Sequence, residues 1–159
     1  SASTTGTDAR ATGGSIIVNA TDQVTLTNGG SITASSVVNP KIPKSGFANA
    51  GDISLNAGLQ IELHNRSSIG TTTESVQANG GNINIRAIDR VRLINNSEIS
   101  TSVKGTEGSG GNIFIDPKMI LVQGSNVTAQ AVEGAGGNIT FVTPLFAADS
   151  ASVVSASSQ

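Results

Sequence analysis

The amino-acid sequence predicts an all-β fold, a parallel β-helix with three short strands per coil and about five to six coils. Three observations predict it. A similar segment returns five times along the 159 residues, apolar and polar residues alternate within each copy, and aromatic residues, at 3%, are too few for a core built around large rings. In a β-helix, equivalent strands stack about 4.8 Å apart, and each coil buries the apolar side of its neighbour.

Each copy of the repeat begins at a glycine pair or at a single glycine. Coils are expected to start near residues 13, 50, 80, 110 and 136, for example with GGNINIRAIDRVRLINNSEIST (80–101) and GGNIFIDPKMILVQGSNVTA (110–129). Residues 1–12 read as the tail of a preceding coil, and residues 13–159 as a single module. The largest departure from the period is SSVVNPKIPKSGFANA, which predicts a long loop at 35–50.

Three apolar segments in each repeat are predicted to form half-buried strands, because their residues alternate with a period of two. No segment shows apolar residues at helical spacing. In the fourth repeat the second strand is expected to point Met119 and Leu121 inward. The predicted core comprises Ile16, Val18, Ile53, Leu55, Ile61, Leu63, Ile83, Ile85, Val91, Leu93, Ile99, Ile113, Ile115, Leu121, Val127 and Ile139.

The corners between strands carry glycine and asparagine. Glycine before the first strand is expected to supply backbone angles closed to other residues, at Gly14, Gly51, Gly81, Gly111 and Gly137. Four amide residues lie four positions before the third-strand apolar residue, and stacked amides at one height can hydrogen-bond along the axis. The predicted ladder is Asn28, Asn65, Asn95 and Gln123. The alternative is that asparagine and glycine only favour turns.

Composition excludes several function classes. The net charge is −2, so the chain lacks the basic stripe that nucleic-acid binding requires. No apolar run is long enough for membrane insertion. Cysteine is absent, which excludes disulfides and thiolate metal sites.

The repeats GGNINIRAIDRVRLINNSEIST and GGNIFIDPKMILVQGSNVTAQAVEGAGGNIT and the ending DSASVVSASSQ resemble the repeat region of large secreted exoproteins of the filamentous-haemagglutinin type, above all the cyanobacterial surface-layer-like ones. The resemblance covers residues 11–159. It implies a right-handed β-helix, export by two-partner secretion, and a role at the surface of a Gram-negative-type bacterium in adhesion or matrix building. It provides no catalytic residues to transfer, and the family's secretion domain is not visible in this sequence.

Parallel β-helices also carry polysaccharide-cleaving sites, which need converging carboxylates. Asp22 and Asp89 hold the same place in two repeats but are separated by Leu59. Two strand spacings put them about 10 Å apart, so corner solvation is the better interpretation. Glu62 and Arg92 face outward on adjacent coils and are expected to form a weak ion pair.

No cofactor or metal is predicted. His64 is the only histidine and is expected to be a solvated outer residue, since further ligands are missing around it. The glycine pairs also lack the aspartate of calcium-binding nonapeptide repeats.

Two aromatic residues are candidates for contact with a partner. Phe47 lies in the long loop, and Phe114 has the parity of an outward residue between Asn84 and Thr140. The sequence thus predicts a non-enzymatic structural segment of a secreted fibre or adhesin that associates end to end or side by side with like solenoids, with a surface glycan or protein as receptor. The alternatives are a carbohydrate-binding or polysaccharide-degrading β-helix and an ice-binding solenoid. The ice-binding alternative is the weaker, because the outward third-strand row mixes Thr, Gly and Ser.

Overall fold

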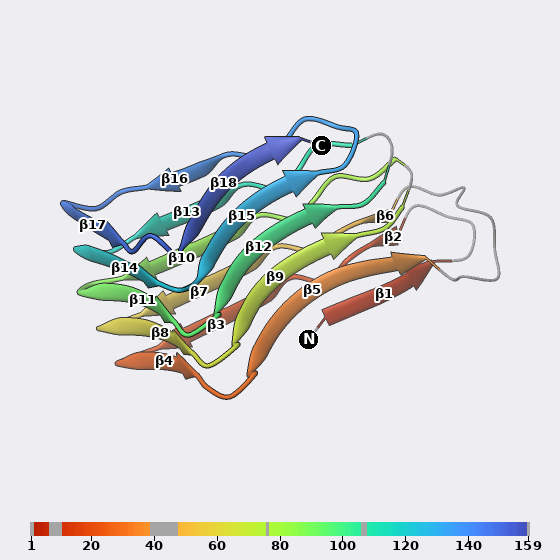
Figure 1. Ribbon diagram of the computed structural model, residues 1–159. Coiled ribbons are helices and arrows are strands. Elements are labelled where there is room, and N and C mark those ends of the chain that lie inside the picture. The colour runs from red at the N-terminus through yellow and green to blue at the C-terminus, as the bar shows by residue number, and fades with distance from the viewer. Residues whose placement is uncertain (1, 7–10, 39–47, 76, 106–107, 159) are drawn as a thin grey trace.

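The computed structural model describes residues 2–6, 11–38, 48–75, 77–105 and 108–158. These residues form strands joined by tight corners, with no helix among them. The strands lie in three parallel sheets that run the length of the molecule as a β-solenoid with three strands per turn (Figure 1). The predicted all-β, parallel architecture is confirmed.

Each sheet collects one strand from every turn. Sheet I contains the first strands, β3 (Ile16–Ala20), β7 (Ile53–Ala57), β10 (Ile83–Ala87), β13 (Ile113–Asp116) and β16 (Ile139–Phe141). Sheet II contains the second strands, β4 (Gln23–Leu26), β8 (Gln60–His64), β11 (Arg90–Ile94), β14 (Met119–Gln123) and β17 (Leu145–Ala148). Sheet III contains β1 (Ala2–Gly6), β5 (Ser31–Val38), β9 (Ser68–Thr73), β12 (Glu98–Val103), β15 (Asn126–Ala131) and β18 (Val153–Ser158). A short pair, β2 (Ala11–Thr12) and β6 (Ala48–Asn49), lies beside them.

Equivalent residues of successive repeats stand directly beside one another. Ile83 pairs with Ile53 on one side and with Ile113 on the other. In the first strands, alternation with a period of two then sends the same positions of successive repeats to the interior. Repetition in the sequence therefore becomes stacking in space.

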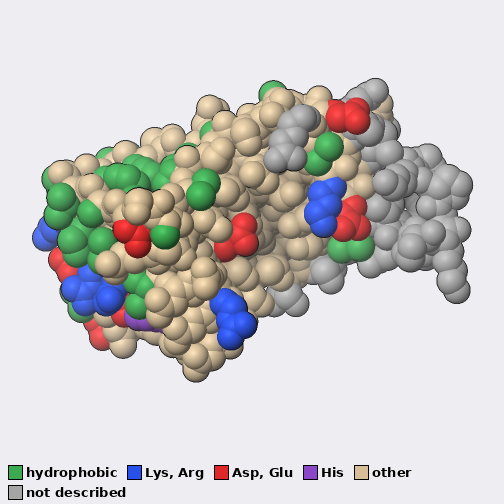
Figure 2. Space-filling model, viewed as in Figure 1, with side chains coloured by type: hydrophobic (Ala, Val, Ile, Leu, Met, Phe, Trp, Pro, Cys, Tyr) green, Lys and Arg blue, Asp and Glu red, His purple; other side chains and the backbone are tan. Residues whose placement is uncertain are grey.

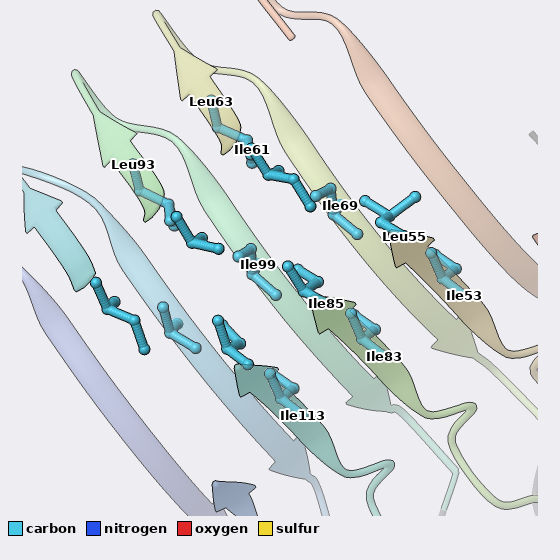
Figure 3. Close-up of a cluster of buried hydrophobic side chains, with 14 of the residues drawn as sticks. Ile53, Leu55, Ile61, Leu63, Ile69, Ile83, Ile85, Leu93, Ile99 and Ile113 are labelled. Carbon is cyan, nitrogen blue, oxygen red and sulfur yellow. The ribbon is translucent and has the colours of Figure 1, made fainter. Parts of the chain in front are cut away.

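The core is a set of aliphatic columns inside three turns, β7–β9, β10–β12 and β13–β15. Ile53, Leu55, Ile83 and Ile85 are 0% exposed. Figure 3 shows the labelled side chains from all three sheets converging on one narrow interior. Burying each such side chain contributes roughly 1.5–3 kcal/mol, so the columns supply most of the cohesion between turns. The same interior holds Ile61, Leu63, Ile69, Val91, Leu93, Ile99, Ile113, Ile115 and Val127.

Burial falls off in the strands on either side of these three turns. Ile16, Val18 and Ile139 are only half-buried and pack against the core from outside it. The inward residues Phe146 and Val154 are each 43% exposed. Hydrophobic side chains accordingly gather in Figure 2 over the end of the molecule where Figure 1 places β16 and β17.

The glycine corner has a different physical reason from the one predicted. Positive φ occurs, among the described glycines, at Gly29 and Gly124 and not at the start of the first strands. A Cβ placed on Gly81 would instead fall against the carbonyl of Gly51, far inside van der Waals contact. Gly51, Gly111 and Gly137 stand in the same relation to the turn before them. Glycine is required there because successive backbones touch.

The inward prediction for Leu121 is wrong, and so is that for Met119. Val91 pairs with Ile120 and Leu93 with Val122, and both partners are 0% exposed. Leu121 pairs with Arg92 on the outer face. The cause is a shorter corner: the step from Ile85 to Val91 is 91 − 85 = 6 residues, whereas the equivalent step from Ile115 to Ile120 is 120 − 115 = 5. Losing one residue exchanges the two faces of the next strand.

The long loop is shorter than predicted. Residues 35–38 continue strand β5, and Ala48 and Asn49 form β6. The remaining part, 39–47, lies outside the described residues, and so does Phe47.

Candidate functional site

Three surface features are candidates for function: a charged cluster on sheet II, an aromatic contact on sheet I, and the amide-rich corner between sheets II and III. Each is built from residues that equivalent turns place side by side.

The charged cluster centres on Glu62 of β8. Its carboxylate lies 3.4 Å from Nε of Arg90, 3.8 Å from Nη1 of Arg92 and 3.2 Å from Nε2 of His64. Only 13% of the Glu62 side chain is exposed. The expected pairing with Arg92 is present, but Arg90 and His64 join it. In Figure 2 the histidine, which is the only one in the chain, lies beside the blue and red atoms of this group.

From the sequence, His64 is expected to be a solvated outer residue, but the structure shows that it is not freely solvated. Its side chain is 21% exposed and is held by Glu62 on its own strand. The cluster joins neighbouring turns through a carboxylate that is largely withdrawn from water, and removing one member of such a group leaves a charge without its partner. Its geometry suits turn-to-turn cohesion.

The carboxylates that a glycosidase would need do not converge. The carbonyl of Asp22 accepts the N–H of Leu59, and the carbonyl of Leu59 accepts the N–H of Asp89. The two aspartates therefore stand two strand spacings apart, roughly 10 Å. Asp89 lies 3.8 Å from Arg90 within its own turn.

No group of three or more histidine, aspartate or glutamate side chains could hold a metal ion within the described ranges. Likewise, no helix among the described residues has the length and hydrophobicity to cross a membrane.

Phe114 lies half-buried on the outer face of sheet I. Its strand neighbours are Asn84 and Thr140, the residues expected beside it. The guanidinium of Arg86 lies over the ring, 5.4 Å from its centre. That cation–π contact covers part of the ring. Phe114 is therefore less available to a partner than its outward position in the strand suggested.

The corner between sheets II and III carries an amide ladder. Nδ2 of Asn65 donates to Oδ1 of Asn28 at 3.2 Å, and Nδ2 of Asn95 donates to Oδ1 of Asn65 at 2.9 Å. All three asparagines have positive φ, between 54° and 56°. The hydrogen bonds orient each amide by the amide of the next turn.

Gln123 does not belong to this ladder. Gln123 pairs with Ile94, the residue before Asn95. The residue that lies beside Asn95 in the next turn is therefore Gly124, which has a φ of 51°. The corner is again one residue shorter: the Ser97 hydroxyl bonds the carbonyl three residues back, whereas the Ser125 hydroxyl bonds the carbonyl two residues back. The carboxylate of Asp149 accepts the N–H of Gly124 where an amide would otherwise stand.

A second amide ladder, beside the glycine corner, was not predicted as such. Asn82 donates to Asp52, Asn112 to Asn82, and Asn138 to Asn112, through both the backbone N–H and the side-chain amide. The distances range from 2.7 to 3.2 Å. The signal was present in the sequence, because these residues directly follow the glycines in each repeat.

A hollow of about 330 Å³ opens at the first of these corners, lined by Asn28, Gly29, Asn65 and Arg66. Sequence reasoning missed Arg66. Its signal is its place: it follows the ladder asparagine, where the neighbouring turns carry Gly29 and Asn96.

Comparisons with known proteins add no relative. No protein-family model matches the chain, and neither a curated protein nor a solved structure matches it.

Proposed function

We propose that this chain is a non-enzymatic structural β-solenoid segment of a secreted or cell-surface fibre or adhesin, contributing to adhesion, matrix or filament assembly. One observation carries the proposal: neighbouring turns contact each other in the interior, at the glycine corner and on the outer surface. Ile53, Ile83 and Ile113 stack inside, glycine backbones touch at one corner, and amides join the turns outside. Such a body is stiff along its axis and extensible by repetition.

The origin of the segment is part of the same proposal. The GGNI starts and the third strands of the repeats support a relation to exoproteins of the filamentous-haemagglutinin type, with two-partner secretion and location at the surface of a Gram-negative-type bacterium. A right-handed winding with about five to six coils belongs to this proposal as well.

Association with like solenoids is supported by the uncovered inward side chains. Phe146 and Val154 belong to the interior rows but remain 43% exposed. The strands that carry them, β17 and β18, pair with one neighbour each among the described residues. An open strand edge is a template for a further strand, which either a following coil of the same chain or the end of a second copy would supply.

Sedimentation velocity and electron microscopy of the purified chain test the assembly. We expect short rods that associate as concentration rises, and Val154→Lys should leave monomers because it places a charge on the stacking end. Val153→Lys is the matched control, since Val153 belongs to the outward row. Wild-type protein that stays a single monomer at every concentration would contradict self-association.

Location is tested separately. An antibody against the purified chain should label intact source cells or their surrounding matrix. Labelling that requires permeabilised cells would overturn the proposed surface role.

The alternative of carbohydrate binding is favoured by one observation, the corner hollow beside Arg66. Its polysaccharide-degrading form finds no such support, because Asp22 and Asp89 are held in separate turns.

A further inference from the structure

Arg66 stands in a backbone conformation that suits it poorly. Its φ is 64°, and it follows Asn65 with φ 54°. The left-handed region costs roughly 1–2 kcal/mol per residue, and glycine is the residue that adopts it routinely, with asparagine and aspartate doing so occasionally. The neighbouring turns obey this rule with Gly29 and Asn96. An arginine at this place is the exception, and backbone strain of this kind is often retained for function.

No contact within the described chain explains the arginine. Its backbone N–H donates to the carbonyl of Asn95 at 2.9 Å, as any residue would there. The side chain is exposed and makes no ion pair or hydrogen bond with another described residue. Its five N–H donors are thus left for an outside acceptor.

The hollow beside Arg66 provides room for that acceptor. Gly29 leaves it open, since a Cβ added there would meet nothing within 4 Å. Asn28 and Asn65 form its polar wall. Because Oδ1 of Asn28 accepts from Asn65, the Nδ2 group of Asn28 remains as a further donor at the hollow that Arg66 also lines.

We propose that this corner pocket, formed by Asn28, Gly29, Asn65 and Arg66, binds a uronic-acid unit of an acidic polysaccharide. The planar guanidinium matches a carboxylate through two parallel hydrogen bonds. The amides beside it offer donors and acceptors of the kind that sugar hydroxyls need. A carboxylate on a peptide is less suited, because no apolar side chain lines the hollow. The inference rests on the proposed adhesive role and names a ligand for this solenoid segment.

Titration calorimetry with a short oligogalacturonate tests the site. We expect saturable binding that Arg66→Gly weakens about tenfold to a hundredfold, the loss of one charged hydrogen-bonded pair. Glycine relieves the left-handed strain, so the variant should melt at the same temperature as the wild type or higher. Loss of binding then cannot be attributed to unfolding. Gly29→Asn, which fills the hollow while tolerating positive φ, should also weaken binding.

Lys118→Ala is the matched control, because it removes an exposed positive charge at a different corner. It should leave the affinity unchanged. Equal weakening by Lys118→Ala, the absence of saturable binding, or equally tight binding of the neutral methyl ester would each overturn the proposal. Tighter binding of poly-glutamate would do so too and would point to a peptide ligand. None of these results bears on rod assembly, which tests the scaffold role by itself.

Discussion

The hydroxyl of Thr101 donates to the carbonyl oxygen of Gly111 at 2.7 Å, across the interior from the third strand of one turn to the glycine corner of the next. Thr71 makes the same bond to Gly81 at 2.8 Å. Both threonines are 0% exposed. The glycine corner brings a polar carbonyl to the edge of an aliphatic core, and a buried carbonyl needs a donor. The small inward residue of the third strand supplies it.

Replacing Thr101 by valine should lower stability. The change keeps the shape of the side chain but removes the donor to Gly111, and leaving a buried acceptor unpaired costs about 1–3 kcal/mol. Urea unfolding followed by circular dichroism measures the loss. Thr128→Val is the control, because Thr128 lies on the outward face of β15. Equal effects of the two changes would mean that the hydroxyl bond contributes nothing.

Gly111→Ala should be strongly destabilising, by at least about 2 kcal/mol, because the added Cβ would strike the carbonyl of Gly81 and force the turns apart. Thermal unfolding measures it. Gly70→Ala serves for comparison, since a Cβ there meets its nearest atom, on Ser100, at an ordinary 3.4 Å. That change should be neutral or slightly stabilising. Similar melting temperatures for the two variants would refute the close-contact explanation of the glycines.

Two substitutions in β14 test directly which of its faces points into the core. Ile120→Asp should unfold the module, because a carboxylate without a partner would enter a column that is 0% exposed. Leu121→Asp should fold, since Leu121 faces outward beside Arg92. Far-ultraviolet circular dichroism of the two variants separates these outcomes. A folded Ile120→Asp together with an unfolded Leu121→Asp would restore the opposite assignment.

The carboxyl group of Asp149 should make the stability of the fold depend on pH in the acidic range. The hydroxyl of Ser152 and, next, the N–H of Gly124 hold its pKa below the ordinary 3.8. A carboxyl group whose pKa is lower in the folded state stabilises the fold above its unfolded pKa, and this contribution disappears as pH falls through the folded pKa. The difference in melting temperature between wild type and Asp149→Asn should therefore shrink below pH 3.8. Titration by nuclear magnetic resonance should place the pKa of Asp149 nearer its ordinary value in Ser152→Ala. An unchanged value would rule out the hydroxyl as the main cause.

The class of fold followed from local pattern because each apolar pair, such as Ile83 and Ile85, alternates with polar residues in the same way in every repeat. Alternation with a period of two is a property of a single strand. Repetition at equal spacing then makes equivalent strands neighbours. The pairing of Ile53, Ile83 and Ile113 needed no further information.

The pattern predicted the ladder of Asn28, Asn65 and Asn95 and the pairing of Glu62 with Arg92, but it did not contain the remaining contacts of the candidate sites. The group around Glu62 includes Arg90 and His64 because side chains from two strands crowd one carboxylate on an outer face. The position of Arg66 after the ladder asparagine is visible in the sequence, but its strain is known only from the φ of 64°.

By itself, the sequence determined that the chain is a stack of three-stranded turns around an aliphatic interior, since both the alternation and the period are written in it. The tertiary structure alone decided which side of β14 faces inward and where the ladder ends. The two corners beside β14 each lack one residue, and counting from the glycines cannot show where a residue has been lost. Only pairing with the neighbouring turn fixes the register, because backbone hydrogen bonds and the packing of Ile120 against Val91 select one alignment.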